Sequence, residues 1–563
     1  MRIVLAQLNF HIGNFEANMN KILQAMEQAR SVKADLIVFP ELATCGYPPR
    51  DFLEFRDFIH KSQEVLEQVR LASAGLAVLI GSPAPNPAAQ GKDLHNAAFF
   101  IHDEKILHQY NKSLLPTYDI FDEYRYFEPS YEFKVLEFKG FRIALTICED
   151  LWNLGNENPL YMVCPLDLMM DQDPDLIFNI SASPFAYDHA AERIDVVRAN
   201  VLKYGKPLFY CNTVGAQTDV VFDGGSLVFS ADGRLYDELP YFEEVLRTYE
   251  VEKKSGNLEV RRSADAISSN YSNSQSTPGE QSKEKYSLIH DALLLGIRDY
   301  FGKLGFKSAI LGLSGGIDSA LTAALAVRAL GKENVNGWML PSRFSSKESV
   351  EDAVALAKNL GIRYEIIEIE PMFSKFLEQL APILAGKPFN VTEENIQARI
   401  RGTLLMAASN KDGHILLNTT NKSEMSVGYG TLYGDLCGGL SVLGDIYKTE
   451  VYQLVHYVNK DTEVIPRNSI LKPPSAELRP GQKDTDSLPP YEQLDPILYQ
   501  YIEKRLGPDE IIALGYEPAL VRRILRMVNV NEFKREQTAP VIRVSPKAFG
   551  MGRRMPIVGK YLS

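Results

Sequence analysis

SAILGLSGGIDSALTAALAVRALG, residues 308–331, joins an apolar run, a Ser-Gly-Gly turn and a helical pattern without interruption. Glycines between a strand and a helix let backbone N–H groups approach an anion, most often a phosphate. The lysine of the usual P-loop is absent, because Ile317 and Asp318 follow the second glycine. The loop 314–319 can still surround a pyrophosphate, and Asp318 within it predicts a triphosphate that carries Mg²⁺. A tight turn with an N-cap residue is the alternative for Ser-Gly-Gly alone.

The chain around this loop alternates between strand and helix patterns. Helices that each end in a glycine are predicted at 290–305, 320–331 and 346–361, and apolar strands at 308–314, 334–341 and 363–370. Repeated βα units of this kind predict a doubly wound parallel sheet, which binds its ligands at the carboxyl ends of the strands. The glycine loop lies at the first such end and is therefore the predicted nucleotide site.

The first half of the chain also alternates between strands and helices. Five apolar runs, predicted to be buried strands, are found at 2–9, 34–42, 76–83, 142–150 and 175–183. The first intervening segment places Met19, Ile22 and Met26 on one helical face. Strand and helix in turn predict an α/β layered fold.

Composition divides the chain and limits its partners. The segment 263–287 is polar and has little to bury, so we expect a domain at 1–245, a polar linker at 246–285 and a second domain at 286–563. A net charge of -12 argues against nucleic acid and anionic membranes as partners. We recognise no signal peptide and no apolar run of about 18 residues. Five scattered cysteines without a CxxC pair fit a reducing cytoplasm.

One cysteine lies at a place suited to catalysis. Cys148 ends the apolar strand RIALTIC, Glu41 ends another predicted strand, and Lys112 follows KILHQYN. A thiol needs a base or a nearby cation to become a good nucleophile. Cys148 taken alone is better explained as a buried structural residue. The three residues together resemble the Glu-Lys-Cys set of the carbon-nitrogen hydrolase, or nitrilase, superfamily over about the first 245 positions.

This resemblance implies an αββα sandwich and a role for each residue. Glu41 would act as general base and acid, Lys112 would stabilise the oxyanion, and Cys148 would attack the side-chain amide of glutamine. The positions that correspond to glutamine contacts in this superfamily are Tyr118, Ser183 and His189. A Lys or Arg is expected at the last of these, so a surface histidine is the alternative there.

The second half resembles two related groups of proteins. SGGIDS resembles the PP-loop of ATP pyrophosphatases, whose fold is that of the adenine nucleotide alpha hydrolases. Three longer motifs, in 392–410, 417–435 and 441–454, look like NAD synthetase. The ATP contacts implied are Gly312, Leu313, Ser314, Gly315, Gly316, Ile317, Asp318, Ser319, Thr419 and Lys448. The deamido-NAD contacts implied are Asn395, Arg399, Glu424 and Lys534, and the implied Mg²⁺ ligands are Asp318 and Glu424.

An amidase followed by a PP-loop synthetase resembles the glutamine-dependent NAD synthetases. The resemblance implies that deamido-NAD, ATP and glutamine become NAD, AMP, pyrophosphate and glutamate, with ammonia passing through a protein tunnel. Small-molecule substrates, Mg²⁺ with the ATP, a homo-oligomer and a cytoplasmic location are expected. Two alternatives stay open: another glutamine-dependent ligase on the same loop, and a non-catalytic scaffold that only binds nucleotide.

Overall fold

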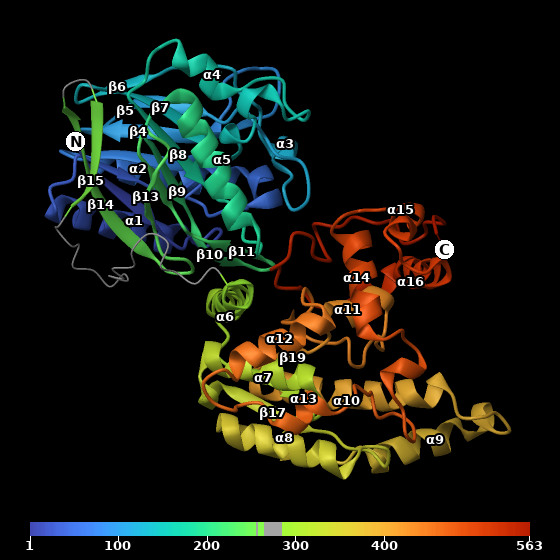
Figure 1. Ribbon diagram of the computed structural model, residues 1–563. Coiled ribbons are helices and arrows are strands. Elements are labelled where there is room, and N and C mark those ends of the chain that lie inside the picture. Colours follow the sequence, from blue (N-terminus) through green and yellow to red (C-terminus); the bar gives the residue numbers. More distant parts are fainter. Residues whose placement is uncertain (255–256, 264–283, 563) are drawn as a thin grey trace. The chain divides into compact units, whose positions relative to one another are not determined.

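The computed structural model describes residues 1–254, 257–263 and 284–562. The chain divides into two compact units, Met1–Lys283 and Glu284–Ser563 (Figure 1). In the described parts, helices of the length and apolarity needed to cross a bilayer are absent.

The first unit contains two large sheets. The seven-stranded sheet runs in the order β15 (Asn257–Arg262), β14 (Val245–Lys254), β1 (Arg2–Gln7), β2 (Leu36–Val38), β3 (Ala77–Pro85), β4 (Leu94–His102) and β5 (Lys105–Asn111). The six-stranded sheet runs in the order β13 (Leu235–Glu238), β12 (Leu227–Phe229), β9 (Leu208–Asn212), β8 (Leu176–Ser181), β7 (Phe141–Ile147) and β6 (Leu136–Phe138).

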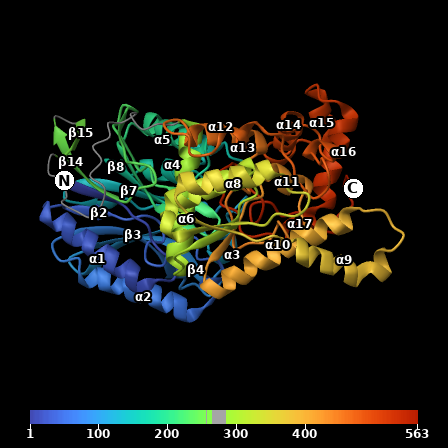
Figure 2. The same ribbon diagram turned by 90° about the horizontal axis from the view of Figure 1, so that it is seen from below.

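Helices cover the outer faces of these two sheets. Along β1, Ile3 and Leu5 belong to a core shared with β7 and β8, whereas Val4 and Ala6 pack against the helices α1 (Phe15–Ser31) and α2 (Arg56–Leu71). The helices α4 (Pro165–Met170) and α5 (His189–Tyr204) contact the six-stranded sheet. Figure 2 shows α1 and α2 side by side along the seven-stranded sheet. The predicted αββα sandwich is confirmed.

Part of the predicted linker 246–285 belongs to this sandwich. Strand β14 pairs with β1 in antiparallel register, with Glu250 opposite Arg2, and β15 pairs with β14 in turn. Tyr249 and Val251 are fully buried in the sheet. The prediction missed these strands because it interpreted their charged residues as linker composition, although charged and apolar residues alternate there as in a half-buried strand. The remaining predicted linker at 264–283 lies outside the described residues.

The second unit is built on a five-stranded parallel sheet. Its order is β18 (Arg363–Ile366), β17 (Val335–Met339), β16 (Ala309–Gly312), β19 (Ile415–Asn418) and β20 (Leu440–Ser441). The chain therefore extends the sheet first to one side of β16 and then to the other, which confirms the doubly wound sheet. The gap between the loops after β16 and β19 is the place where such sheets bind ligands.

Helices pack on this sheet and beside it. The helices that contact the strands are α7 (Ile317–Leu330), α8 (Lys347–Leu360) and α10 (Val391–Asp412). Beside them, α6 (Lys285–Leu304) and α12 (Lys448–Val458) pack on α7, and α9 (Glu370–Leu384) packs on α10. A separate apolar core joins the helices α11 (Lys422–Val427), α14 (Tyr491–Ile502), α15 (Pro508–Ala513) and α16 (Pro518–Val530). The predicted glycine ends are confirmed at Gly305, Gly331 and Gly361, each directly after its helix. Gly305 and Gly361 have left-handed backbone conformations.

Candidate active sites

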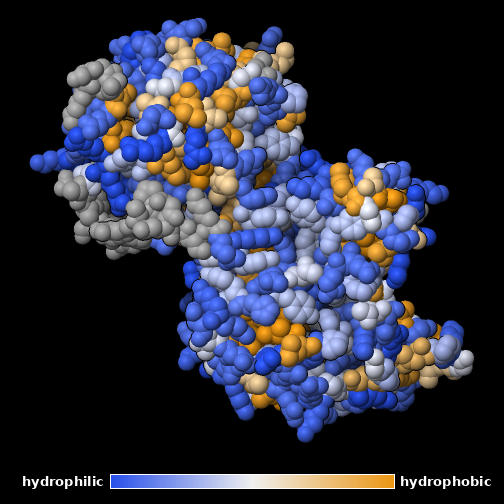
Figure 3. All heavy atoms as spheres, viewed as in Figure 1, coloured by the Kyte–Doolittle hydropathy of each residue, from blue (hydrophilic) through white to orange (hydrophobic). Residues whose placement is uncertain are grey.

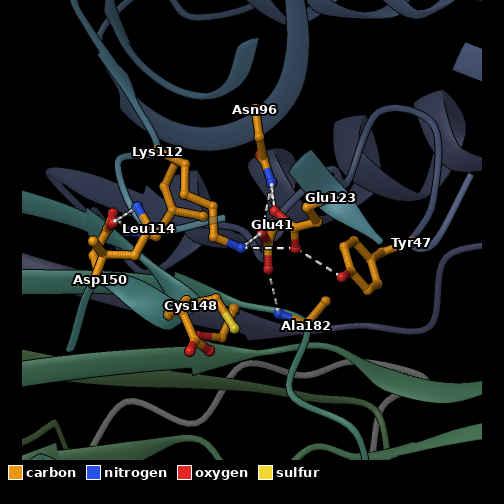
Figure 4. A network of polar contacts seen from close by, with 12 residues as sticks. Glu41, Tyr47, Asn96, Lys112, Leu114, Glu123, Cys148, Asp150 and Ala182 are labelled. Atoms are coloured by element: carbon orange, nitrogen blue, oxygen red, sulfur yellow. Dashed lines mark hydrogen bonds and ion pairs between the residues drawn. The ribbon is translucent and has the colours of Figure 1, made fainter. Parts of the chain in front are cut away.

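A buried ion pair forms the centre of the first site (Figure 4). Lys112 directly follows β5, and its Nζ lies 2.7 Å from Oε1 of Glu41, which comes three residues after β2. Both side chains are fully buried. The other carboxylate oxygen of Glu41 accepts a 3.0 Å hydrogen bond from the backbone N–H of Ala182. Glu41 is thus held in one orientation from two sides.

Sequence reasoning missed two members of this network. Glu123 is buried, and its Oε1 lies 2.8 Å from Nζ of Lys112 and accepts a 2.8 Å hydrogen bond from the Tyr47 hydroxyl. Asn96 on β4 donates from Nδ2 to Glu41 at 2.7 Å and to Glu123 at 3.3 Å. Burial raises the pKa of Glu123, with Lys112 opposing the shift. No local motif marks Glu123 or Asn96, because the fold alone brings them to Lys112.

Cys148 lies beside this network at a sharp end of β7. Its φ of 42° falls in the left-handed region, which a residue with a side chain seldom occupies. The residue is 5% exposed. Burial raises the pKa of the thiol well above its usual range; Glu41 adds to the rise and Lys112 opposes it. This shift favours the protonated thiol, so a base is needed to remove the proton before Cys148 can attack.

A close backbone contact positions Glu41. A Cβ atom added to Gly81 on β3 would lie 2.3 Å from the backbone nitrogen of Leu42 and 2.7 Å from Cα of Glu41. The carbonyl of Gly81 also accepts a hydrogen bond from the Thr44 N–H, and its N–H donates to the Pro40 carbonyl. Only glycine lets β3 approach the segment that carries Glu41 this closely.

The predicted glutamine contacts form two groups at the turn that carries Cys148. In the first, the Tyr118 hydroxyl donates to Glu149 at 3.0 Å, and the Tyr161 hydroxyl donates to the same carboxylate at 2.7 Å. Burial raises the pKa of Glu149. Tyr118 and Tyr161 also line a surface cavity together with Tyr131. Glu149 and Tyr161 were not predicted.

The second group contains Ser183 and His189. The Ser183 hydroxyl lies 3.2 Å from Nε2 of His189, and the imidazole ring stacks on Trp152 with 5.4 Å between ring centroids. The Nδ1 atom lies 3.2 Å from a Glu192 oxygen. The His189 side chain is 25% exposed and is held by three neighbours. It is therefore more constrained than the surface histidine that was the alternative.

The second site is a cavity at the carboxyl ends of β16, β17 and β19. Nine of the ten predicted ATP contacts line it: Gly312, Leu313, Ser314, Gly316, Ile317, Asp318, Ser319, Thr419 and Lys448. The tenth, Gly315, has a φ of 78°, and a Cβ atom there would lie 2.2 Å from the Ser349 carbonyl oxygen. The turn therefore requires glycine at Gly315 for both its conformation and its packing.

Two carboxylates of this cavity are suited to a divalent cation. Nζ of Lys448 forms an ion pair with Asp318 and lies 3.9 Å from Glu424. Burial raises the pKa of Glu424 well above its usual range, and Asp318 adds to the rise. The Lys448 ammonium already faces both carboxylates, and carboxylate oxygens are also the ligands that suit Mg²⁺. Asp484 lines the same cavity and its charge also raises the pKa of Glu424. Among the described residues no group of three His, Cys, Asp or Glu is arranged to hold a metal ion, so phosphate or water oxygens would complete the coordination.

The remaining predicted dinucleotide contacts meet at one loop. Asn395 accepts a 2.8 Å hydrogen bond from Thr431, and Nε of Arg399 lies 3.3 Å from the Leu432 carbonyl oxygen. Lys534 donates to the carbonyls of Gly428 and Gly430. None of the three side chains lines the cavity itself. The loop 428–434 connects them to it, because Tyr429 and Gly434 are among the lining residues.

Comparisons with known proteins agree with this pair of sites. The carbon-nitrogen hydrolase family matches residues 2–256, and the NAD synthase family matches residues 289–538. A glutamine-dependent NAD(+) synthetase from Synechocystis sp. is 44% identical over 563 residues, which cover 99% of this chain and 98% of the relative. This chain belongs to the glutamine-dependent NAD(+) synthetases. A second glutamine-dependent NAD(+) synthetase, from Thermotoga maritima, is 41% identical and is covered over 99% of its length.

Solved structures of glutamine-dependent NAD(+) synthetases extend the likeness to the fold. The protein from Acinetobacter baumannii, solved in complex with adenosine diphosphate, is 36% identical with a TM-score of 0.76, and the match covers 100% of this chain and 99% of that one. The protein from Cytophaga hutchinsonii is 20% identical with a TM-score of 0.81 over 98% of its chain, which concerns the fold alone. Membership of this family decides against both alternatives from the sequence, another glutamine-dependent ligase and a non-catalytic scaffold.

Proposed function

We propose that the two units carry out two reactions in series, with glutamine hydrolysis in the first supplying ammonia to the second. The second unit then amidates deamido-NAD to NAD at the expense of ATP. The observation that carries the proposal is the buried contact of Lys112 with Glu41 and Glu123 beside Cys148. Burying these charges costs desolvation free energy that their pairing recovers poorly, and apolar residues would stabilise the fold better. The network is therefore better explained by catalysis than by stability.

In the first unit Glu41 takes the thiol proton, and Sγ of Cys148 attacks the side-chain carbonyl carbon of glutamine. Lys112 stabilises the negative oxygen of the tetrahedral intermediate. Glu41 returns the proton to the nitrogen, the C–N bond breaks, and ammonia leaves a thioester on Cys148. Water then releases glutamate. Tyr118, Ser183 and His189 are the proposed contacts of the glutamine.

In the second unit the loop 314–319 and Lys448 hold the triphosphate of ATP. The nicotinate carboxylate of deamido-NAD attacks the α-phosphorus, and pyrophosphate leaves. Ammonia then attacks the adenylated carbonyl carbon and displaces AMP. Asp318 and Glu424 are the proposed ligands of Mg²⁺, which when bound would neutralise charge on the phosphates. Asn395, Arg399, Glu424 and Lys534 are the proposed contacts of deamido-NAD.

Assembly and location complete the proposal. Figure 3 shows apolar residues gathered over α15 and α16, where Leu514 and Val530 are 57% and 45% exposed. Exposed apolar surface of this kind supports a homo-oligomer. A cytoplasmic location, drawn from the five scattered cysteines, stays a prediction, as does the exclusion of nucleic acid and membrane partners, drawn from the acidic composition.

The test is NAD formation by the Cys148→Ala variant with glutamine or with ammonium chloride as nitrogen source. We expect activity with ammonium and none with glutamine, because only the first reaction needs the thiol. Glutamine-driven activity in the variant would contradict the role of Cys148. Loss of both activities, with the wild type active, would contradict the independence of the two reactions.

A further inference from the structure

Three cationic side chains line the cavity of the second unit: Arg401, Lys448 and Lys472. Lys448 pairs with Asp318, and Nζ of Lys472 lies 3.1 Å from Asp352. Arg401 makes no ion pair within 4.0 Å in the described part of the chain. Its Nε donates a hydrogen bond to the neutral carbonyl oxygen of Leu340, at 2.8 Å.

The two carboxylates whose charges act on Arg401, Asp435 and Glu477, form hydrogen bonds with other groups. Asp435 accepts a hydrogen bond from the backbone N–H of Thr431. Glu477 accepts hydrogen bonds from the hydroxyls of Ser346 and Ser349, at 2.9 and 2.8 Å. Burial lowers the pKa of the Arg401 guanidinium to about 10, and Asp435 and Glu477 offset only part of this shift. Arg401 is half-buried and lines the cavity, so its positive charge faces the cavity with no ion pair from the described residues to balance it.

The position of Arg401 indicates which ligand would balance this charge. Leu340 directly follows β17, the strand that pairs with β16, and the backbone N–H of Leu313 donates to Trp338 on β17. Arg401 therefore reaches, from α10, the same edge of the sheet from which the loop 314–319 starts. A guanidinium at such an edge matches the geometry of a phosphate, which it can bind with two parallel N–H groups.

We propose that Arg401 binds a phosphate group of a nucleotide held in this cavity. The inference rests on the proposed function, because that function places both ATP and a dinucleotide in the second unit. Either molecule supplies the same phosphate chemistry. Among the described residues no carboxylate forms an ion pair with Arg401, and a bound phosphate would supply one.

A structural arginine predicts different behaviour from a ligand-binding one. Replacing an arginine that holds the fold together through an ion pair leaves a buried carboxylate unpaired and lowers stability. Replacing Arg401 with methionine removes an uncompensated charge and keeps much of the side-chain volume. The thermal midpoint of ligand-free Arg401→Met is therefore expected to equal or exceed that of the wild type.

The test uses the full-length chain and measures the affinities for Mg-ATP and for deamido-NAD separately, with Arg401→Met, Arg401→Lys and the wild type. We expect Arg401→Met to weaken one of the two affinities by about 10- to 100-fold, as for loss of a hydrogen bond to a charged group. The ligand affected identifies the source of the phosphate. Arg401→Lys keeps the charge and should lie between Arg401→Met and the wild type. Lys411→Met, an exposed change on the same helix, is the matched control and should change neither affinity.

Two results would overturn the inference. The first is that Arg401→Met binds Mg-ATP and deamido-NAD as tightly as the wild type does. The second is that the thermal midpoint of ligand-free Arg401→Met lies several degrees below that of the ligand-free wild type. Glutamine hydrolysis by the first unit should be the same in all of these variants. The proposed function is tested separately, by the wild type alone: a wild type that forms no NAD would contradict the proposed function, whatever the Arg401 variants do.

Discussion

Substitution of Gly81 with alanine tests how closely the first site depends on backbone packing. The added Cβ would lie 2.3 Å from the backbone nitrogen of Leu42, whereas ordinary contacts begin at 3.4 Å. The segment that carries Glu41 must therefore retreat by about 1 Å, the difference between these two distances. The atoms in the way are backbone atoms, so a rotamer change cannot relieve the contact. A misplacement of about 1 Å in a reacting group can cost about 100-fold in rate.

We therefore expect the kcat for glutamine hydrolysis by Gly81→Ala to fall by about 100-fold, or about 2.7 kcal/mol in barrier height. Release of glutamate from glutamine measures this rate. NAD formation from ammonium should be unchanged, because the substitution lies in the first unit. Gly140→Asn is the matched control: nothing lies within 4 Å of a Cβ there, and asparagine tolerates its φ of 78°. Glutamine hydrolysis within about threefold of the wild type would refute the reasoning about backbone distance.

Three further predictions concern the second unit. Gly315→Ala should lower NAD formation from either nitrogen source by about 100-fold, because its Cβ would meet the Ser349 carbonyl oxygen at 2.2 Å; glutamine hydrolysis that fell equally would contradict this. Removal of Mg²⁺ with a chelator should stop NAD formation from ammonium but leave glutamine hydrolysis intact, and unimpaired synthesis would exclude the metal role of Asp318 and Glu424. Burial raises the pKa of Glu503 from 4.5 to about 7, although the Lys422 ammonium 2.6 Å away opposes the shift, so the stability that Glu503 contributes is lost as pH rises through this window. As the pH rises through this window, the free energy of unfolding of Glu503→Gln should therefore increase by up to about 3 kcal/mol relative to that of the wild type. Thermal unfolding at several pH values measures this difference, and a difference that does not change with pH would refute the raised pKa of Glu503.

The features that could be predicted from the sequence are those that neighbouring residues in the chain determine. Continuous apolar runs predicted the strands, glycines predicted the helix ends, and the string around Gly315 predicted the turn below the nucleotide cavity. The αββα sandwich and the doubly wound sheet are confirmed. The roles of the individual site residues stay predictions. The strands β14 and β15 were missed because their charged residues resemble a polar linker, and the pairing of β14 with β1 joins residues about 250 positions apart, as for Arg2 and Glu250.

Side chains that act through distant contacts could not be predicted from the sequence. Glu123 and Asn96 have ordinary neighbours in the chain, and only the fold brings them to Lys112. Arg401 lies two residues from the predicted contact Arg399, yet one side chain lines the cavity and the other contacts the loop 428–434. The direction in which a helical side chain points is set by tertiary packing, which spacing alone does not reveal.

The pairing of β14 with β1 governs when the first unit can complete its fold during synthesis. The N-terminal amine donates to the Val251 carbonyl at 2.7 Å, so the first and the last strands of the unit lie in one sheet. Until β14 has left the ribosome, β1 presents an open edge that other chains can pair with. A separately expressed glutaminase must for the same reason extend to Arg262, the end of β15. A fragment that stops at residue 245 would expose the backbone of β1 and is expected to aggregate.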